Sequence, residues 1–379
     1  MVRSSLIDGP VLLDVTGVEG VLSELRRLGH TLIGPTRRDG AIVLDEITST
    51  ADLPQGWGDE QGPGRSRLHR RDDDAWFGWA VGPTTWRRFL SPPVRELWRA
   101  RRDGHGFELV VDDAPAPPLA LIGVRPCDLA ALGIQDRVAA GGPCPDTDLL
   151  QIHRDAFVLA VSCGAPAATC FCASTGTGPR AGEGADLTMI ELVDDAGHRF
   201  VVEATSARGA EVLASVPHPT ATEADQRAAD AVIAAATAAQ SRTLPDRDAC
   251  ARLVTRAEHP HWADVAERCL SCASCTLVCP TCFCSRIADG TDLAGDEAWR
   301  SQRWDSCFSL DHSFIHGGSI RADVRARYRQ WLTHKLATWW DQLDTSGCVG
   351  CGRCITWCPA GIDLTVEARA IVEGAADAH

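Results

Sequence analysis

The sequence has no long apolar run, since no stretch approaches the roughly 20 residues needed to span a bilayer. Its best apolar runs, Leu119–Val124 and Phe157–Val161, have the length of buried strands. The N-terminus also lacks a basic segment followed by an apolar stretch, so no signal peptide is evident. These absences predict a cytoplasmic protein with no membrane partner.

Positive charge is scarce as well, because 37 Lys and Arg residues face 51 Asp and Glu residues and leave a net charge of −14. That balance argues against nucleic acid as a partner. The sequence also has no Gly-x-Gly-x-x-Gly between a strand and a helix, no P-loop and no nucleophile–base pair. We therefore expect no catalytic residue in this chain and place the substrate chemistry on other subunits.

Cysteine is absent before Cys127 and abundant after it. Of the 17 cysteines, five lie between Cys127 and Cys172, and the others lie between Cys250 and Cys358. In a reducing cytoplasm, clustered thiols indicate metal ligands rather than disulfides.

The apolar patterns predict an α+β protein with two domains. Residues 1–245 are expected to form an α/β domain, and residues 246–379 a helical ferredoxin-type domain with two [4Fe–4S] clusters. A Gly-, Arg- and Asp-rich stretch over residues 55–74 is expected to be a solvated loop. The other expected elements are strands at Leu12–Val15, Ala41–Leu44, Phe107–Val111, Leu119–Val124 and Phe157–Val161, a hairpin over residues 189–203, and helices over residues 223–240 and 321–340.

Two cysteine runs in the C-terminal third share one spacing. They are Cys269-x-x-Cys272-x-x-Cys275-x-x-x-Cys279-Pro and Cys348-x-x-Cys351-x-x-Cys354-x-x-x-Cys358-Pro. Both match the bacterial ferredoxin run, whose first three cysteines bind one [4Fe–4S] cluster and whose fourth binds the other. The expected ligand sets are therefore crossed: Cys269, Cys272, Cys275 and Cys358 for the first cluster, and Cys348, Cys351, Cys354 and Cys279 for the second.

Zinc is the alternative metal for closely spaced cysteines. Zinc sites usually use pairs of Cys-x-x-Cys, whereas each run here has a third evenly spaced cysteine and a trailing Cys-Pro. The pattern favours iron–sulfur clusters, and crossed ligands place the two clusters close enough together for an electron to pass between them.

Residues 280–347 separate the two runs, and their composition favours an α-helical module rather than a small β-containing ferredoxin. This segment carries a basic stretch that is suited either to stabilising reduced clusters or an acidic partner, or simply to forming a solvated helix face. The stretch consists of Arg321, Arg325, Arg327, Arg329 and Lys335.

A further group of thiols lies upstream. Cys127 and Cys163 each follow a predicted strand, and parallel strands would bring both to one sheet edge, where α/β proteins place ligands. Cys170 and Cys172 lie on the loop after Cys163. We expect these four thiols to bind a third [4Fe–4S] cluster, with unliganded buried thiols as the alternative. No role is assigned to the remaining thiols, which are Cys144, Cys250, Cys282, Cys284 and Cys307.

Several segments together resemble the β subunit of cytoplasmic, NAD(P)-linked, sulfhydrogenase-type [NiFe] hydrogenases, a family related to the anaerobic sulfite reductases. The resemblance is weak before Phe77 and strong after Cys269, and all eight ferredoxin-type ligand positions are retained. The segments are Gly-Val-Arg-Pro-Cys127-Asp, Cys279-Pro-Thr-Cys-Phe-Cys284, Gly317-Gly-Ser-Ile-Arg321, Arg327-Tyr-Arg-Gln-Trp-Leu-Thr-His-Lys335, and the stretch from Gly347 to Asp363.

The resemblance implies an electron-transfer subunit within a heterotetramer. A partner subunit would bind flavin and exchange hydride with NAD(P)H, and small and large hydrogenase subunits would reach the nickel–iron site. Two alternatives stay open: an equivalent relay subunit of an anaerobic sulfite or sulfur reductase, and a self-contained oxidoreductase whose α/β domain binds a flavin.

Overall fold

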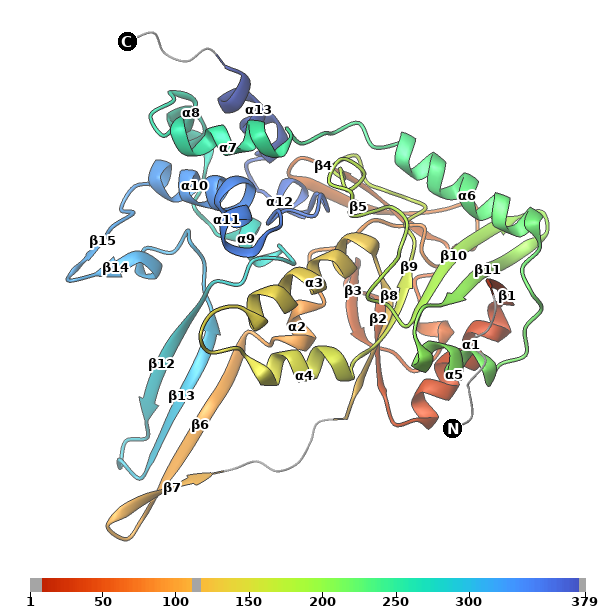
Figure 1. Cartoon of the computed structure of the whole chain (residues 1–379), viewed down its shortest axis with the longest axis horizontal. Coiled ribbons are helices and arrows are strands. Elements are labelled where there is room, and N and C mark those ends of the chain that lie inside the picture. Colours follow the sequence, from red (N-terminus) through yellow and green to blue (C-terminus); the bar gives the residue numbers. More distant parts are fainter. Residues whose placement is uncertain (1–8, 111–116, 375–379) are drawn as a thin grey trace.

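The computed structural model describes residues 9–110 and 117–374, and its largest element is a mixed seven-stranded sheet (Figure 1). Its four central strands are parallel, and antiparallel strands extend the sheet at both edges. In spatial order the strands are β1 (Val11–Asp14), β11 (Gly197–Ala204), β10 (Leu187–Asp194), β9 (Phe157–Val161), β8 (Leu119–Val124), β2 (Thr31–Arg38) and β3 (Ala41–Glu46). The expected strands at these positions and the 189–203 hairpin are confirmed.

Helices cover both faces of this sheet because its central strands are apolar on both sides. In β8, Ala120 and Ile122 join the core under α1, whereas Leu121 and Val124 join the core on the opposite face. A register shift between Ile122 and Val124 produces the change of side, and Gly123 takes a φ of 85° there. The helices of this part are α1 (Val15–Arg27), α2 (Arg87–Leu90), α3 (Pro126–Ala140), α4 (Thr147–Asp155), α5 (Ala207–Ala214) and α6 (Glu223–Ala238), together with the 3-10 turn η1 (Thr50–Asp52).

The prediction of a solvated loop over residues 55–74 is wrong, because β4 (Trp57–Gly62) and β5 (Arg65–Arg70) form a hairpin there. Its stabilising contacts are polar and therefore gave no apolar alternation. The buried amide of Gln61 donates to the carbonyl of Val81 at 3.2 Å and accepts from the Thr356 hydroxyl at 3.0 Å. The hairpin therefore packs against the second cysteine run.

Most of the C-terminal part is helical, with a core that includes Trp262, Trp331 and Leu332. The expected helix over Arg321–Trp340 is confirmed as α10 (Val324–Thr333), a π-helical turn η3 (His334–Thr338) and α11 (Trp339–Leu343). Asp323 caps its start by accepting a hydrogen bond from the backbone N–H of Ala326. The other helices are α7 (Arg247–Thr255), α8 (His261–Arg268), α9 (Ser274–Leu277), α12 (Arg353–Thr356) and α13 (Leu364–Glu373), with a 3-10 turn η2 (Asp311–Ser313).

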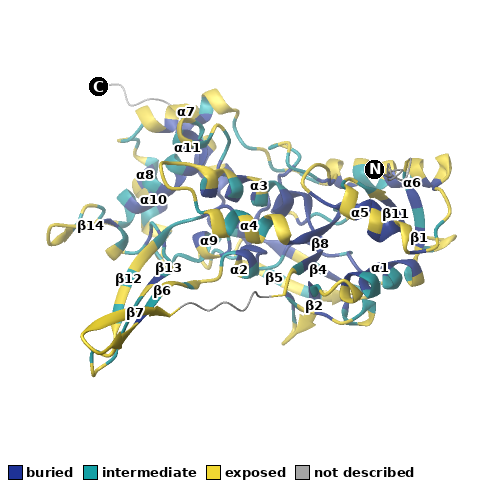
Figure 2. Ribbon diagram, turned by 60° about the horizontal axis from the view of Figure 1, so that its bottom comes forward, coloured by how far each residue is buried: buried dark blue, intermediate teal, exposed yellow. Residues whose placement is uncertain are grey.

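The segment between the two runs is not wholly helical, so that prediction is wrong for residues 285–304. There β12 (Ser285–Thr291) and β13 (Glu297–Trp304) pair with β6 (Val94–Asp103) and β7 (Gly106–Val110) in a sheet that projects from the molecule (Figures 1 and 2). Cross-strand charge pairs such as Arg99–Glu297 hold it, and these give no apolar period. Val111, the last residue of a predicted strand, lies outside the described residues.

A two-stranded ribbon of β14 (Phe314–Ile315) and β15 (Gly318–Ser319) completes the described elements. The pairing of β6 with β13 crosses the predicted domain boundary near residue 245, and that boundary stays a prediction. In the described part of the chain, no helix combines the length and the apolar character needed to cross a membrane.

Candidate iron–sulfur sites

The loops of the two cysteine runs have the same backbone shape. In the first run, Ser271 and Ala273 take positive φ values of 52° and 64°, and in the second run Gly350 and Gly352 take 62° and 74° at the equivalent positions. These left-handed residues turn the chain tightly between successive cysteines before α9 and α12 begin. The shared spacing therefore produces a shared loop.

Glycine is required in the second loop by close neighbours as well as by φ. A Cβ on Gly350 would lie 2.6 Å from the carbonyl oxygen of Phe171, and a Cβ on Gly352 would lie 2.4 Å from the carbonyl oxygen of Thr169. The backbone N–H of Phe171 also donates to the carbonyl of Gly350 at 2.8 Å. The upstream Cys170–Cys172 segment thus lies directly against the second run.

The first expected ligand set is brought together in the structure. Four thiols line one small cavity, whose remaining wall is apolar and includes Phe308, Tyr328 and Trp331. Three of the thiols come from the first run and one from the end of the second, as expected for crossed ligands. They are Cys269, Cys272, Cys275 and Cys358.

The second expected set also lies together. Burial, and then the neighbouring thiols of Cys348, Cys351, Cys279 and Cys275, raise the pKa of Cys354 well above its usual value. Three of these neighbours belong to the second set, and Cys275 belongs to the first. The two sets are therefore adjacent, and α9 contacts α12 between them.

A buried ammonium group lies at the second set. Lys335 is 3% exposed, and its Nζ donates to Cys279 Sγ at 3.3 Å and to the carbonyl of Gly347 at 3.0 Å. A hydrogen bond from Cys282 and the charge of Lys335 hold the pKa of Cys279 well below its usual value, against the effect of burial. The expectation of a solvated basic face is therefore wrong for Lys335, although it is the only lysine in the chain and could have been noticed on that ground.

The donor set fits iron–sulfur clusters chemically. Burial raises the pKa of Cys275 well above its usual value, and it raises that of Cys348 to about 12. These thiols keep their protons until a metal replaces them, because coordination deprotonates a thiol. Within residues 9–110 and 117–374, no three His, Cys, Asp or Glu side chains converge as they would on a single ion.

The upstream thiols also come together. Strands β8 and β9 are parallel, so their carboxyl ends bring Cys127 and Cys163 to one edge, as predicted. Burial, and then Cys163 and Cys172, raise the pKa of Cys170 well above its usual value. Burial and Asp128, and then neighbours that include Cys351 and Cys172, raise that of Cys127.

A buried ion pair joins this upstream group to the second run. Arg353 donates two hydrogen bonds of 2.8 Å to the carboxylate of Asp128, and their side chains are 2% and 3% exposed. Asp128 directly follows Cys127, and Arg353 lies between Cys351 and Cys354. Sequence reasoning missed this pair because its members lie far apart in the chain.

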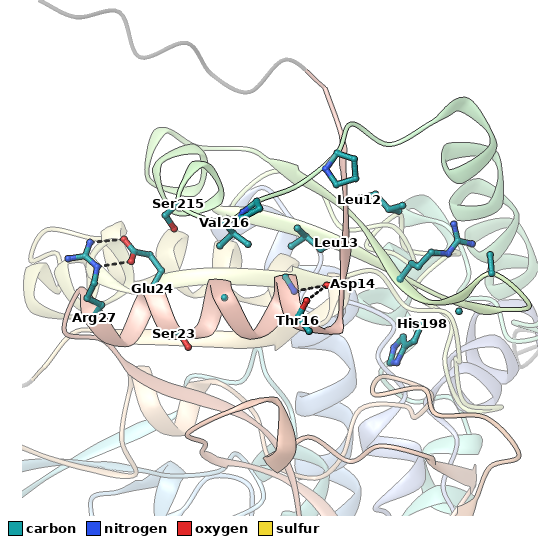
Figure 3. Close-up of a pocket in the computed structure, with 17 residues that line it drawn as sticks. Leu12, Leu13, Asp14, Thr16, Ser23, Glu24, Arg27, His198, Ser215 and Val216 are labelled. Carbon is teal, nitrogen blue, oxygen red and sulfur yellow. Dashed lines mark hydrogen bonds and ion pairs between the residues drawn. The ribbon is translucent and has the colours of Figure 1, made fainter.

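The largest cavity near the α/β sheet edge holds none of these thiols. It has a volume of about 820 Å³ and lies between α1, β1 and the loop after α5 (Figure 3). Asp14 caps α1 there, and Glu24 pairs with Arg27 at 2.7 Å. No cysteine contributes to its wall.

A family described as a 4Fe-4S dicluster domain matches residues 268–362, which contain both runs. Together with the paired thiol sets, this match defines the class of the protein as an iron–sulfur electron-transfer subunit with a 4Fe-4S dicluster domain. Among curated proteins, sulfhydrogenase 2 subunit beta of Pyrococcus furiosus is 33% identical over 263 residues, which cover 67% of this chain and 74% of the relative. The chain belongs to this family of sulfhydrogenase beta subunits, which confirms the resemblance. No solved structure matches the chain.

Proposed function

We propose that the chain relays electrons between a flavin- and NAD(P)-binding subunit and a [NiFe] hydrogenase module. The observation that carries the proposal is the meeting of the two crossed thiol sets, with Cys275 of one beside Cys354 of the other. Bound there, two [4Fe–4S] clusters would supply one-electron redox centres.

The protein's own residues provide a surface end and a buried end for this path. Cys272 is exposed, and its neighbour Leu270 is 67% exposed, so the first set lies near the surface. Cys351 of the second set is buried. A partner that exchanges electrons with the chain would approach the Leu270–Cys272 loop.

The upstream group supports a third [4Fe–4S] cluster, held by Cys127, Cys163, Cys170 and Cys172, as a continuation of the path. The thiol of Cys170 lies 3.7 Å from the carbonyl oxygen of Cys351, so the upstream group borders the second set. The arrangement is a row of three thiol groups from the surface into the α/β part. Unliganded thiols remain the alternative.

The hydrogenase assignment rests on family membership. The same row of thiols would also serve a sulfite- or sulfur-reducing enzyme as the terminal partner. A self-contained flavin oxidoreductase is the other alternative, and the cavity beside α1 is the place in the α/β part with room for such a group.

Anaerobic affinity purification of the tagged full chain, followed by mass spectrometry, tests the proposal. We expect co-purification of a flavin-binding subunit and of two hydrogenase subunits, one of them containing nickel. Recovery of a sulfite- or sulfur-reducing subunit instead would establish the second candidate. Flavin bound to the chain itself, with no stable partner, would contradict the relay.

A further inference from the structure

Three thiols that belong to none of these sets lie together beside the second one. Cys282 and Cys284 immediately precede β12, and Cys307 follows β13, so the β12–β13 hairpin brings them to one end. The backbone N–H of Asp305 donates to the carbonyl of Cys284 at 2.9 Å and closes that end. Cys284 is within hydrogen-bond contact of Cys307, and Cys282 has the same contact with Cys279.

The sequence around these thiols repeats the upstream motif. Thr-Cys-Phe-Cys occurs at residues 169–172 and again at residues 281–284. Both threonines are fully buried and tie their segments to the second run: Thr169 bonds the hydroxyl of Thr356 at 2.7 Å, and Thr281 donates to the carbonyl of Gly347 at 2.6 Å. One copy therefore lies against each end of that run.

A second, independent observation is a buried cation without an acidic partner. Arg87 is 6% exposed, and it forms no ion pair with any described residue. Its guanidinium stacks over Trp304 at 3.9 Å, and the ionisable groups that act on it are Cys282, Cys279 and Cys284. A buried charge requires a compensating one, and thiolates held by a metal provide it.

His312 supplies a fourth potential ligand at the same end. Its Nδ1 faces Asp305 Oδ2 at 3.3 Å, and it acts electrostatically on Cys284. A metal-binding histidine usually donates its other ring N–H to a carboxylate in this way, which leaves Nε2 for the metal.

We propose that Cys282, Cys284, Cys307 and His312 bind an additional [4Fe–4S] cluster beside the second ferredoxin-type set. The assignment rests on the proposed electron relay, to which it adds a branch. The thiols do not converge on a point, as ligands of a single ion would, so the larger cluster is the matching group. The histidine gives this site a higher reduction potential than an all-cysteine site, because histidine ligation raises the potential of iron–sulfur centres.

Iron and acid-labile sulfide analysis of the anaerobically reconstituted full chain tests the site. We expect Cys307→Ser to lose about four irons per chain, as one [4Fe–4S] cluster requires. The control Cys250→Ser should lose none, since Cys250 is a buried thiol that bonds the carbonyl of Pro245 away from these groups. Unchanged iron in both Cys307→Ser and Cys284→Ser would overturn the proposal, as would one zinc ion per chain at this site.

A second variant keeps the test decisive if Cys307→Ser fails to fold. His312→Cys should keep all its iron and shift one redox transition to a more negative potential. An unchanged potential would remove His312 from the ligand set. Failure of the relay itself is distinguishable, because it would appear as undiminished electron transfer in a variant of the second set while the iron loss in Cys307→Ser persisted.

Discussion

Each C-terminal cysteine run places three thiols on a single tight loop, whereas the α/β part assembles four thiols from the ends of two strands and one loop. In the first case the ligand geometry follows from spacing and from two left-handed residues per loop. In the second case it follows from the parallel pairing of β8 with β9. The first kind of site can therefore tolerate changes in the rest of the fold, and the second kind cannot.

The largest effect should follow from the loss of a ligand in the loop-based sites. We expect Cys351→Ser to lose about four irons per chain and to abolish hydrogen-dependent NAD(P) reduction by the complex, because the second set lies between the other two. The α/β part should stay folded by circular dichroism. Cys144→Ser, at an exposed thiol, is the control, and retained hydrogen-dependent reduction in Cys351→Ser would refute the relay.

Loss of a ligand in the strand-based site should have a narrower effect. Cys163→Ser should remove about four further irons and leave the electron paramagnetic resonance signals of the two ferredoxin-type clusters in place. The measurement is iron content together with the reduced-state spectrum. If iron content does not change, the upstream thiols are unliganded and the comparison between two kinds of cluster site fails.

The ion pair between the two regions should contribute strongly to stability. Asp128→Ala would leave the buried guanidinium of Arg353 without its partner, which typically costs about 3–5 kcal/mol. Anaerobic denaturation with guanidinium chloride would measure this loss. The exposed pair of Arg300 with Asp289 is the matched control, and Asp289→Ala should cost less than about 1 kcal/mol. Equal losses would mean that the two regions are not held together at this point.

The buried ammonium of Lys335 should tune the second cluster. Lys335→Met removes a positive charge beside Cys279, so the reduced form becomes less favourable and the reduction potential falls. The expected change is on the order of 100 mV, because unit charges a few Å apart interact by a few kcal/mol at an effective dielectric constant of about 20. A redox titration measures it, with Arg329→Met on the neighbouring α10 as control. A potential equal to that of the control would remove Lys335 from the site.

The smallest effect should come from a position far from every thiol. Asp14→Ala removes the N-cap of α1 and should cost about 1 kcal/mol at neutral pH. Hydrogen bonds from Thr16 and Gly17 lower the pKa of Asp14, so its charge contributes stability above the unfolded pKa of about 4. That contribution is lost as pH falls through the folded pKa. Denaturation at pH 7 and pH 3 should show the difference shrinking, with iron content unchanged; a constant difference would contradict the capping role.

The sequence predicted those parts of the molecule that local patterns specify. Apolar runs located β8 and β9, an apolar stripe located α1, and cysteine spacing located both loops of the dicluster domain. The β12–β13 hairpin escaped because its strands are held by charge pairs such as Arg99–Glu297 rather than by an apolar face.

The contacts that connect the sites were beyond reach for a different reason. The pairing of Asp128 with Arg353 and the approach of Phe171 to Gly350 join residues far apart in the chain, and no local period encodes them. The burial of Lys335 beside Cys279 likewise depends on how η3 packs against the first run. Such contacts appear only when the whole fold is assembled.

Metal analysis of the anaerobically isolated full chain, combined with Mössbauer spectroscopy, tests the crossed thiol sets most directly. We predict at least eight irons per chain in [4Fe–4S] form, with negligible zinc. The variants Cys358→Ser and Cys279→Ser should each lose one cluster, the first from the set of the first run and the second from the set of the second run. Zinc in place of iron, or fewer than eight irons in the intact protein, would contradict the assignment.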